Sequence, residues 1–329
     1  MKVYRNTEGL PSFGKAALTI GTFDGVHTGH QQIIDQLRTE AEKIGGESVI
    51  VTFDPHPRKI IGNAAKEIKL INTLEEKIDL LEIEGVDHLV IVPFTLAFSQ
   101  LSAVEYIRDF LVAKFHPHTI IIGYDHRFGK GRQGDFTLME EFSRIFRYHL
   151  CEIPVHLIDA ISVSSTRIRV AVEQADVETA NDLLGYPFFF EGKVISGNRM
   201  GRNLGYPTAN LSIGNDEKLI PGNGVYAVQV QIMEGPNGGE QAVPVLTKFH
   251  RAPESSLTGM MNIGFRPTLD GSIRQIEVNI FDFDRDIYGK SLRIYVRKHL
   301  RKEEKFSGLE ALKEQLGKDS REARAFLAG

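Results

Sequence analysis

The chain is 329 residues long, enough for about two domains of ~150 residues each, and 42% of its residues are apolar. Its formal net charge of −4 excludes the strongly basic surface of a nucleic-acid-binding protein, and its single cysteine excludes an intramolecular disulfide. Its apolar runs are too short for a ~20-residue membrane helix or a signal peptide, so we expect a cytoplasmic protein that binds neither membrane nor nucleic acid.

The first half of the chain alternates between strand patterns and helix patterns. Five runs rich in Ile and Val predict strands: Ala16–Ile20, Glu47–Phe53, His88–Val92, Thr119–Gly123 and Val155–Ile158. Amphipathic patterns predict helices between them, at Gln31–Ile44, Leu74–Glu84, Val104–Lys114 and Leu138–Tyr148. The second and third of these helices begin with capping boxes, Thr73 with Glu76 and Ser102 with Glu105. The alternation predicts a Rossmann-like α/β domain with an open, doubly wound parallel sheet.

The pattern changes after Gly185-Tyr186-Pro187, where short β-rich runs separated by Gly, Pro and Asn begin. Six runs predict strands: Phe188–Ile195, Val225–Met233, Val243–Leu246, Met260–Ile263, Gln275–Phe281 and Leu292–Val296. Six short strands predict a small antiparallel β-barrel, because closure removes unpaired edges. We expect a hairpin loop at Glu234–Glu240, a last helix at Leu309–Phe326, and two domains, 1–187 and 188–329.

The strongest motif in the first domain is Gly21–His30, with the sequence G-T-F-D-G-V-H-T-G-H. It follows the first predicted strand and opens the first predicted helix, whose N-terminus can bind a phosphate. His27 and His30 are three residues apart, so both imidazoles can face one phosphate, and Gly25 and Gly29 permit close approach of the backbone. An isolated H-x-x-H is more often structural, and zinc is disfavoured because a third ligand is missing.

A second motif, Ser164–Arg169 (S-S-T-R-I-R), follows the last predicted parallel strand. At a helix start its hydroxyls and arginines would form a second phosphate site, although alone it is more simply a helix cap before a basic face. Two phosphate sites at the carboxyl edge of one sheet predict a nucleotide site. The sequence contains no Walker A motif and no G-x-G-x-x-G after the first strand, which disfavours a P-loop NTPase and a dinucleotide dehydrogenase.

Together these two motifs resemble the H-x-G-H nucleotidyltransferase superfamily. The segments Phe53–Pro57 and Gly123–Gly129 are similar to the adenylyltransferase half of the bacterial bifunctional riboflavin kinase/FAD synthetases. The second half contains a segment similar to the G-x-P-T-A-N motif of riboflavin kinases, Gly201–Asn210. Four further segments resemble the kinase in the family's order: Asn262–Thr268, Glu277–Phe283, Tyr288–Lys290 and Leu300–Phe306. The resemblance covers nearly the whole chain.

The resemblance implies that the first domain transfers AMP from ATP to FMN, giving FAD and pyrophosphate without a protein nucleophile. His27 and His30 would hold the ATP phosphates during the transfer. The departing pyrophosphate would be held by Ser164, Ser165, Thr166 and Arg169. The remaining expected binding residues are Gly21, Phe23, Asp24 and Gly29 in the loop, and Phe53 and His56 near the flavin. Asp24 would fix the loop or meet Mg²⁺ through water, and His56, between two prolines, is otherwise a turn residue.

The resemblance also implies that the second domain phosphorylates riboflavin with ATP, giving FMN. Thr208 and Asn210 project to the same side of an extended segment, so both oxygens can reach one Mg²⁺; without the resemblance this is only a polar turn. Gly201 and Gly205 would let a loop cover the nucleotide phosphates. Glu277 would be the general base, a role that rests on the resemblance because a glutamate in an alternating strand usually faces solvent.

Two alternatives remain at this point. One is a cytidylyltransferase or pantetheine-type adenylyltransferase with an unrelated β domain, and the other makes the barrel a flavin-sensing module. Magnesium-dependent release of ADP with riboflavin as sole acceptor distinguishes them from a bifunctional enzyme. The sequence leaves open weak self-association and the roles of Asp125, His126, Arg266 and the loop 247–257.

Overall fold

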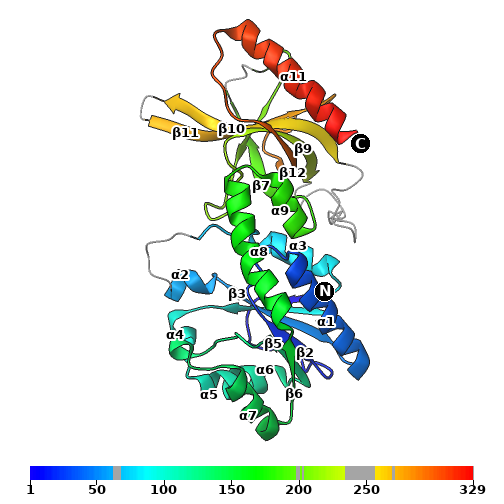
Figure 1. Ribbon diagram of the computed structural model, residues 1–329, viewed down its shortest axis with the longest axis vertical. Coiled ribbons are helices and arrows are strands. Elements are labelled where there is room, and N and C mark those ends of the chain that lie inside the picture. The colour runs from blue at the N-terminus through cyan, green and yellow to red at the C-terminus, as the bar shows by residue number, and fades with distance from the viewer. Residues whose placement is uncertain (62–67, 198–200, 202–203, 234–255, 269–270, 329) are drawn as a thin grey trace. The chain divides into compact units, whose positions relative to one another are not determined.

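The computed structural model describes residues 1–61, 68–197, 201, 204–233, 256–268 and 271–328. Its internal contacts divide the chain into two compact units, Met1–Thr166 and Arg167–Gly329, which are described separately (Figure 1). Over the described residues, no helix combines the length and apolar character needed to cross a membrane.

The first unit is built on a six-stranded parallel sheet with the order β1-β4-β3-β2-β5-β6. Its strands are β1 (Lys2–Tyr4), β2 (Ala17–Ile20), β3 (Ser48–Asp54), β4 (His88–Pro93), β5 (Thr119–Gly123) and β6 (His149–Ile153). The order runs outward from β2 in both directions, so right-handed crossovers place α1 (Thr28–Ile44) and α3 (Leu74–Ile83) on one face. The segments between β4 and β6 cover the other face (Figure 1). The predicted doubly wound sheet is confirmed.

The other helices of this unit are short, apart from the last. They are α2 (Pro57–Ile61), α4 (Leu96–Ser99), α5 (Ala103–Glu105), the π-helix η1 (Tyr106–Val112), α6 (Ala113–Phe115), the 3₁₀ turn η2 (Lys130–Arg132), α7 (Phe136–Phe146) and α8 (Val155–Glu173). Both predicted capping boxes are present, at the starts of α3 and α5. The division between the two units falls within α8.

The position of the last parallel strand differs from the prediction. The strand is β6, and the predicted run Val155–Ile158 instead begins α8. β6 lies at the sheet edge and is partly exposed, so it lacks the continuous apolar run of a central strand. Pro154 ends it and precedes a helix, because proline cannot donate to a ladder but is tolerated where a helix starts.

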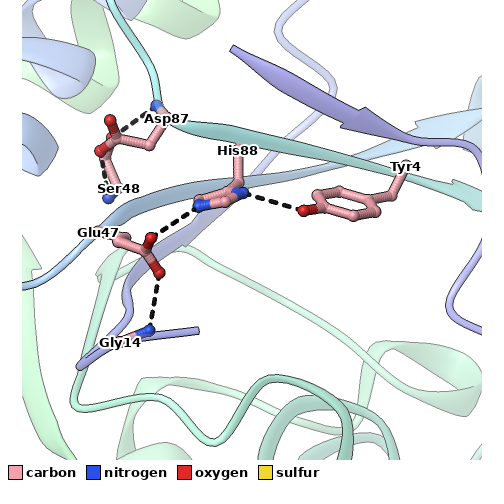
Figure 2. Close-up of polar contacts among 6 residues, drawn as sticks. All are labelled: Tyr4, Gly14, Glu47, Ser48, Asp87 and His88. Carbon is pink, nitrogen blue, oxygen red and sulfur yellow. Dashed lines mark hydrogen bonds and ion pairs between the residues drawn. The ribbon is translucent and has the colours of Figure 1, made fainter. Parts of the chain in front are cut away.

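A polar network joins strands at the amino edge of the sheet (Figure 2). The buried His88 lies 3.3 Å from Glu47 through Nε2 and 3.3 Å from the Tyr4 hydroxyl through Nδ1. The second Glu47 oxygen accepts the Gly14 N–H at 2.7 Å. These contacts secure β1, which has only three residues and which the sequence patterns missed. The opposite, carboxyl edge is where ligands bind in open α/β sheets.

The second unit is a closed antiparallel barrel with the strand order β10-β11-β8-β7-β12-β9. Its strands are β7 (Phe189–Ile195), β8 (Ala209–Ser212), β9 (Gly224–Met233), β10 (Leu257–Thr268), β11 (Gly271–Ile280) and β12 (Ser291–Arg301). It also contains α9 (Val177–Leu184) and α11 (Leu309–Leu327), the latter as predicted. The six-stranded antiparallel barrel with a C-terminal helix is therefore confirmed.

One member of the barrel was not expected as a strand. It is β8, too short to show an alternating pattern, and it carries Asn210. The predicted strand Val243–Leu246, the hairpin loop Glu234–Glu240 and most of the loop 247–257 lie outside the described residues. So does the side chain of Arg266.

Helix α9 packs against β12 within the second unit. The Asn181 side chain donates from Nδ2 to the Val296 carbonyl at 3.0 Å and accepts the Phe188 N–H at 2.7 Å. These bonds explain why the contact boundary follows Thr166, ahead of the predicted boundary between residues 187 and 188.

Candidate active sites

A tightly folded turn connects β2 to α1 in the first unit. Phe23, Gly25 and Val26 have φ values of 47°, 99° and 36°, and Phe23 and Val26 are buried. A β-branched residue at positive φ is strained, and such strain persists only where the surrounding structure imposes it. The turn therefore holds the N-terminus of α1 in a defined direction at the carboxyl edge of the sheet.

His27 and His30 lie together at the start of α1. His27 is the N-cap, and its Nδ1 accepts the His30 N–H at 3.4 Å. The two rings stack with centroids 3.8 Å apart and an interplanar angle of 17°. Burial lowers the pKa of His30 well below its usual value, with smaller contributions from His27 and Lys77, so this imidazole is neutral near pH 7. The three-residue spacing thus places the two rings side by side at the start of α1, and their binding of one phosphate stays a prediction.

Two anchors hold the turn that precedes the histidines. The buried Asp24 accepts the N–H groups of Ile71 and Asn72 at Oδ1, at 3.0 and 3.2 Å. Lys77 of α3 donates from Nζ to the Thr22 carbonyl at 2.7 Å. Asp24 thus fixes the loop, the first of its two expected roles. The sequence analysis did not single out Lys77, because a lysine on an amphipathic helix is normally exposed.

The second motif is placed differently from the prediction. Residues 164–169 lie in the middle of α8, so they offer no helix N-terminus to a phosphate, and that part of the prediction is wrong. The shift follows from the early start of α8 after Pro154. Ser165 nevertheless reaches the first motif, with its Oγ 2.9 Å from His27 Nε2. Ser164 is buried, Thr166 is exposed, and the half-buried Arg169 belongs to the second unit.

The Gly21 and Gly29 positions also belong to this turn and helix. A Cβ at Gly21 would come within 3.0 Å of the Phe23 ring, and Gly29 is buried in the first turn of α1. Phe23 itself packs against His30, with ring centroids 5.1 Å apart. The structure therefore brings Gly21, Phe23, Asp24, His27, Gly29, His30 and Ser165 into one region.

An aromatic cluster occupies the same carboxyl edge of the sheet. It consists of Phe53, Phe94, Phe98, Tyr106, Phe110 and Phe128, joined by edge, tilted and stacked contacts. Phe53 lies near the end of β3, with its ring 5.4 Å from that of Phe94. Tyr106 and Phe110 come from η1, and π-helical turns are frequent at functional sites. Phe94, Tyr106, Phe110 and Phe128 are buried, whereas Phe53 and Phe98 are half-buried.

Two histidines near this cluster have different settings. His56 accepts the Arg58 N–H at 3.2 Å through Nδ1, which matches the turn role the sequence allowed. His126 stacks on Phe128 with centroids 5.7 Å apart, and burial lowers its pKa to about 4. His126 is therefore neutral near pH 7, while its neighbour Asp125 is exposed.

In the barrel, three polar residues form a row across adjacent strands. Asn210 of β8 pairs with Glu277 of β11, and Glu277 pairs with Asn262 of β10. Residues directly opposite each other in neighbouring strands lie on the same face. These three side chains, with Gly201 and Thr208, line one cavity of about 270 Å³. The structure thus brings together four of the predicted kinase residues.

The segment containing Thr208 is held by its own contacts. Asn279 donates from Nδ2 to the Pro207 carbonyl at 2.7 Å, and the Gly201 carbonyl accepts the N–H groups of Leu204 and Tyr206. A Cβ at Gly201 would collide with the Tyr206 carbonyl oxygen, and Gly205 has a φ of 82°. Both positions therefore favour glycine.

A second cavity of about 460 Å³ also borders Thr208. Its other walls include Val278, Phe283, Arg285 and Tyr288. Two separate cavities in the barrel therefore share Thr208 as a common border residue.

Helix α11 supplies one wall of the first cavity and is fastened to β12. Arg301 binds the buried Asp319 through Nε and Nη2, at 2.9 and 2.8 Å, and Gln315 donates to the same carboxylate at 2.8 Å. Arg301 lines the cavity with Leu312 and Leu316 of α11. The sequence analysis did not find this pair, because no local pattern links residues on a strand and on a separate helix.

Both halves of the chain match known protein families. Residues 11–167 match the family model for FAD synthetase, and residues 184–327 match the model for riboflavin kinase. The bifunctional riboflavin kinase/FMN adenylyltransferase of Listeria monocytogenes is 37% identical over 312 residues, covering 94% of this chain and 92% of the relative. The chain belongs to the bifunctional riboflavin kinase/FMN adenylyltransferase family.

Other relatives agree with this assignment. The bifunctional riboflavin kinase/FMN adenylyltransferase of Escherichia coli K12 is 33% identical over 329 residues, covering 99% of this chain and 98% of the relative. A crystal structure described as a macrolide-efflux protein from Streptococcus pneumoniae shares the fold, with a TM-score of 0.80, 29% identity and 98% coverage of both chains. The chain thus has riboflavin kinase and FMN adenylyltransferase activities and produces FMN and FAD. The family excludes both alternatives, the other nucleotidyltransferases and the flavin-sensing module.

Proposed function

We propose that residues 1–187 adenylate FMN at the carboxyl edge of the parallel sheet and that residues 188–329 phosphorylate riboflavin in the cavity between the barrel and helix α11. The stacked pair His27 and His30 at the start of α1 supports the first assignment. The cross-strand row of Asn210, Glu277 and Asn262 supports the second. ATP is a substrate of both reactions, which favours a cytoplasmic location. Weak self-association stays a prediction, testable by sedimentation velocity.

In adenylyl transfer, a phosphate oxygen of FMN attacks the α-phosphorus of ATP. A new P–O bond forms, the bond to the β-phosphate oxygen breaks, and pyrophosphate leaves with the electron pair. The two imidazoles and the first N–H groups of α1 stabilise the charge that develops on the phosphoryl oxygens. Ser165 orients His27 through the 2.9 Å contact to Nε2. Ser164, Thr166 and Arg169 keep their proposed roles toward pyrophosphate.

The aromatic cluster beside this turn is proposed to bind the flavin ring of FMN. Phe53 and Phe98 are its half-buried members, and Phe53 lies near the end of β3, at the edge where the phosphate of FMN must reach the ATP. Stacked and edge contacts to a planar ring contribute stability beyond the burial of area alone. His56 and the neutral His126 flank this region from the segments after β3 and β5.

In the kinase reaction, we assign riboflavin to the first barrel cavity. Leu312, Leu316 and Phe306 give that cavity an apolar wall, and Glu277 lies on the cross-strand row that faces it. Glu277 takes the proton of the terminal ribityl hydroxyl as the hydroxyl oxygen attacks the γ-phosphorus of ATP. The bond from that phosphorus to the bridging oxygen breaks, and ADP leaves with the electron pair. The second cavity is assigned to ATP. It borders the riboflavin-assigned cavity at Thr208, so the two substrates would meet at that border.

Thr208 and Asn210 also fit a magnesium ion in chemical type. Both offer neutral oxygen ligands, they lie two residues apart, and they line the same cavity as Glu277. Mg²⁺ binds few protein oxygens and keeps the rest of its shell for phosphates and water. When bound, the ion would neutralise charge on the ATP phosphates. Gly201 and Gly205 allow the preceding loop to approach those phosphates closely.

Two variants test the assignment of the activities. We expect His30→Ala to reduce FAD formation from added FMN by about 10²–10³-fold, the effect of losing one preorganised donor, while riboflavin phosphorylation is unchanged. We expect Glu277→Gln to abolish phosphorylation while leaving FMN adenylylation unchanged. Both rates are measured by chromatography of the flavins with ATP and Mg²⁺. A fall of both activities in one folded variant contradicts the assignment.

A further inference from the structure

A buried lysine lies beside the first active site and takes part in none of the steps above. Lys77 is only 7% exposed, although it lies on the amphipathic helix α3. Lysines are rarely buried unless they are paired, because removing an ammonium group from water is costly. The buried ammonium donates to the Thr22 carbonyl at 2.7 Å, and the carboxylates of Asp24 and Asp54 stabilise its charge. The buried ammonium group of Lys77 therefore points to a role in the neighbouring site.

The carbonyl that Lys77 binds belongs to the turn that aims the histidines. Thr22 comes directly before the positive-φ residue Phe23, and its carbonyl also accepts the Thr52 hydroxyl at 3.2 Å. Asp24, just after Phe23, is held by the backbone immediately ahead of α3. Helix α3 and the residues just before it therefore bind the strained turn on both sides of Phe23, at Thr22 and at Asp24. Loss of either contact would change the directions in which His27 and His30 point.

Lys77 also acts on the charge state of the site. Its positive charge is one of the causes that lower the pKa of His30, after burial and together with His27. Among the described residues, the charged and titratable groups that act on Lys77 and His30 include the Asp24 and Asp54 carboxylates and the His27 imidazole. Lys77 therefore helps keep His30 neutral and adds a positive charge beside the phosphate-binding turn.

We propose that Lys77 is a positioning residue for FMN adenylylation: through the Thr22 carbonyl it fixes the turn that aims His27 and His30 at the ATP phosphates. The proposal rests on the assignment of adenylylation to this turn. Lys77 touches backbone and not the reacting atoms, so it acts through the histidines. A misplacement of catalytic groups by about 1 Å can cost about 10²-fold in rate.

Variants of the full-length enzyme test this role. We expect Lys77→Met to lower kcat for FMN adenylylation by about 10²-fold, with KM for FMN changed less than about twofold. We expect Lys77→Arg, which keeps the charge and a donor, to recover at least about tenfold of the lost rate. Lys114→Met removes an exposed lysine of the same unit and serves as the matched control, with wild-type kinetics expected. Riboflavin phosphorylation is expected to be unchanged in all three variants.

A spectroscopic readout separates positioning and charge from a merely structural role. The imidazole resonances of His30, assigned by their absence in His30→Ala, are titrated by NMR. Removal of a neighbouring positive charge favours the protonated imidazole, so His30 should titrate at higher pH in Lys77→Met than in wild type. In Lys77→Arg it should titrate as in wild type.

A wild-type kcat in folded Lys77→Met overturns the proposal. If that variant does not fold, Lys77→Gln replaces it, because its polar side chain is one bond shorter and removes both the charge and the donor that contacts Thr22. A wild-type kcat in folded Lys77→Gln also overturns the proposal. The adenylyltransferase assignment is tested separately, by the loss of activity in His30→Ala, so the two failures are distinguishable.

Discussion

Removing the Asp319 carboxylate should loosen helix α11, which lines the cavity proposed to bind riboflavin. Asp319 is 3% exposed and accepts hydrogen bonds from Arg301 and Gln315. Breaking a buried ion pair costs about 3–5 kcal/mol, because one charge is left without a partner. Arg301 keeps its bond to the Lys302 carbonyl and its side chain is 17% exposed, so Asp319→Ala should fall at the lower end, about 3 kcal/mol.

The effect should appear both in stability and in substrate binding. For a unit the size of Arg167–Gly329, about 3 kcal/mol corresponds to a fall in Tm of roughly 6–12 °C. Calorimetry of the full chain measures this, and the transition of the second unit is identified as the one that riboflavin shifts to higher temperature. The KM for riboflavin should rise, since Leu312 and Leu316 of the same helix line the cavity.

A matched control lies on the same helix. Glu322 pairs with Lys298 at 3.1 Å, but this pair is exposed, and such pairs contribute less than about 1 kcal/mol. Glu322→Gln should therefore change the same Tm by less than about 4 °C and leave the KM for riboflavin unchanged. Equal shifts in the two variants, or a large fall in Tm with no change in KM, would refute this account of α11.

Three further predictions follow from other parts of the structure. The Gly14 N–H, and then His88, hold the pKa of Glu47 below its usual value. Ionised Glu47 therefore stabilises the fold at pH values above its unfolded-state pKa of about 4.5. This stabilisation is lost as the pH falls through the lowered pKa of the folded state. The Tm difference between wild type and Glu47→Gln should therefore be present at pH 6 and shrink below pH 4.5, whereas Glu141→Gln, at an exposed site, should show no such dependence. Thr208→Val should raise the Mg²⁺ concentration needed for half-maximal riboflavin phosphorylation and leave the Mg²⁺ requirement of FMN adenylylation unchanged; an unaltered requirement for phosphorylation contradicts the assigned ligand. A fragment starting at Arg167 should fold and make FMN but no FAD. A fragment starting at Gly185 should melt at a lower temperature, because it lacks Asn181 and its hydrogen bonds to Val296 and Phe188. Equal Tm values for the two fragments would show that α9 is dispensable.

Features encoded by local patterns were predictable from the sequence. The central strands β2 to β5 are buried on both faces, so they appear as continuous apolar runs, and the capping boxes of α3 and α5 depend on residues only three apart. His27 and His30 are also a local pair, because one helical turn sets their relation. In each case the interacting groups lie within a few residues of each other.

Features that depend on the folded chain were not predictable in the same way. β6 is a half-exposed edge strand, and a periodic pattern alone could not separate it from the start of α8. Lys77 reaches Thr22 across 55 positions, and Arg301 reaches Asp319 from a different element. The burial of Lys77 and the pairing of Arg301 with the buried Asp319 arise only when the elements pack. A lysine or arginine in an amphipathic pattern carries no local sign of that burial.

The central claim, that the chain carries two activities at separate sites, is tested most directly by mixing two variants that each lack one of the activities. Glu277→Gln cannot convert riboflavin to FMN, and His30→Ala forms FAD only at the reduced rate. With riboflavin, ATP and Mg²⁺, neither variant alone should produce FAD at an appreciable rate, but an equimolar mixture should, because FMN made by one variant is adenylated by the other. Chromatography of the flavins over time measures this. Restored FAD formation supports two separate sites, and a mixture as inactive as its components, with both variants folded, contradicts the account.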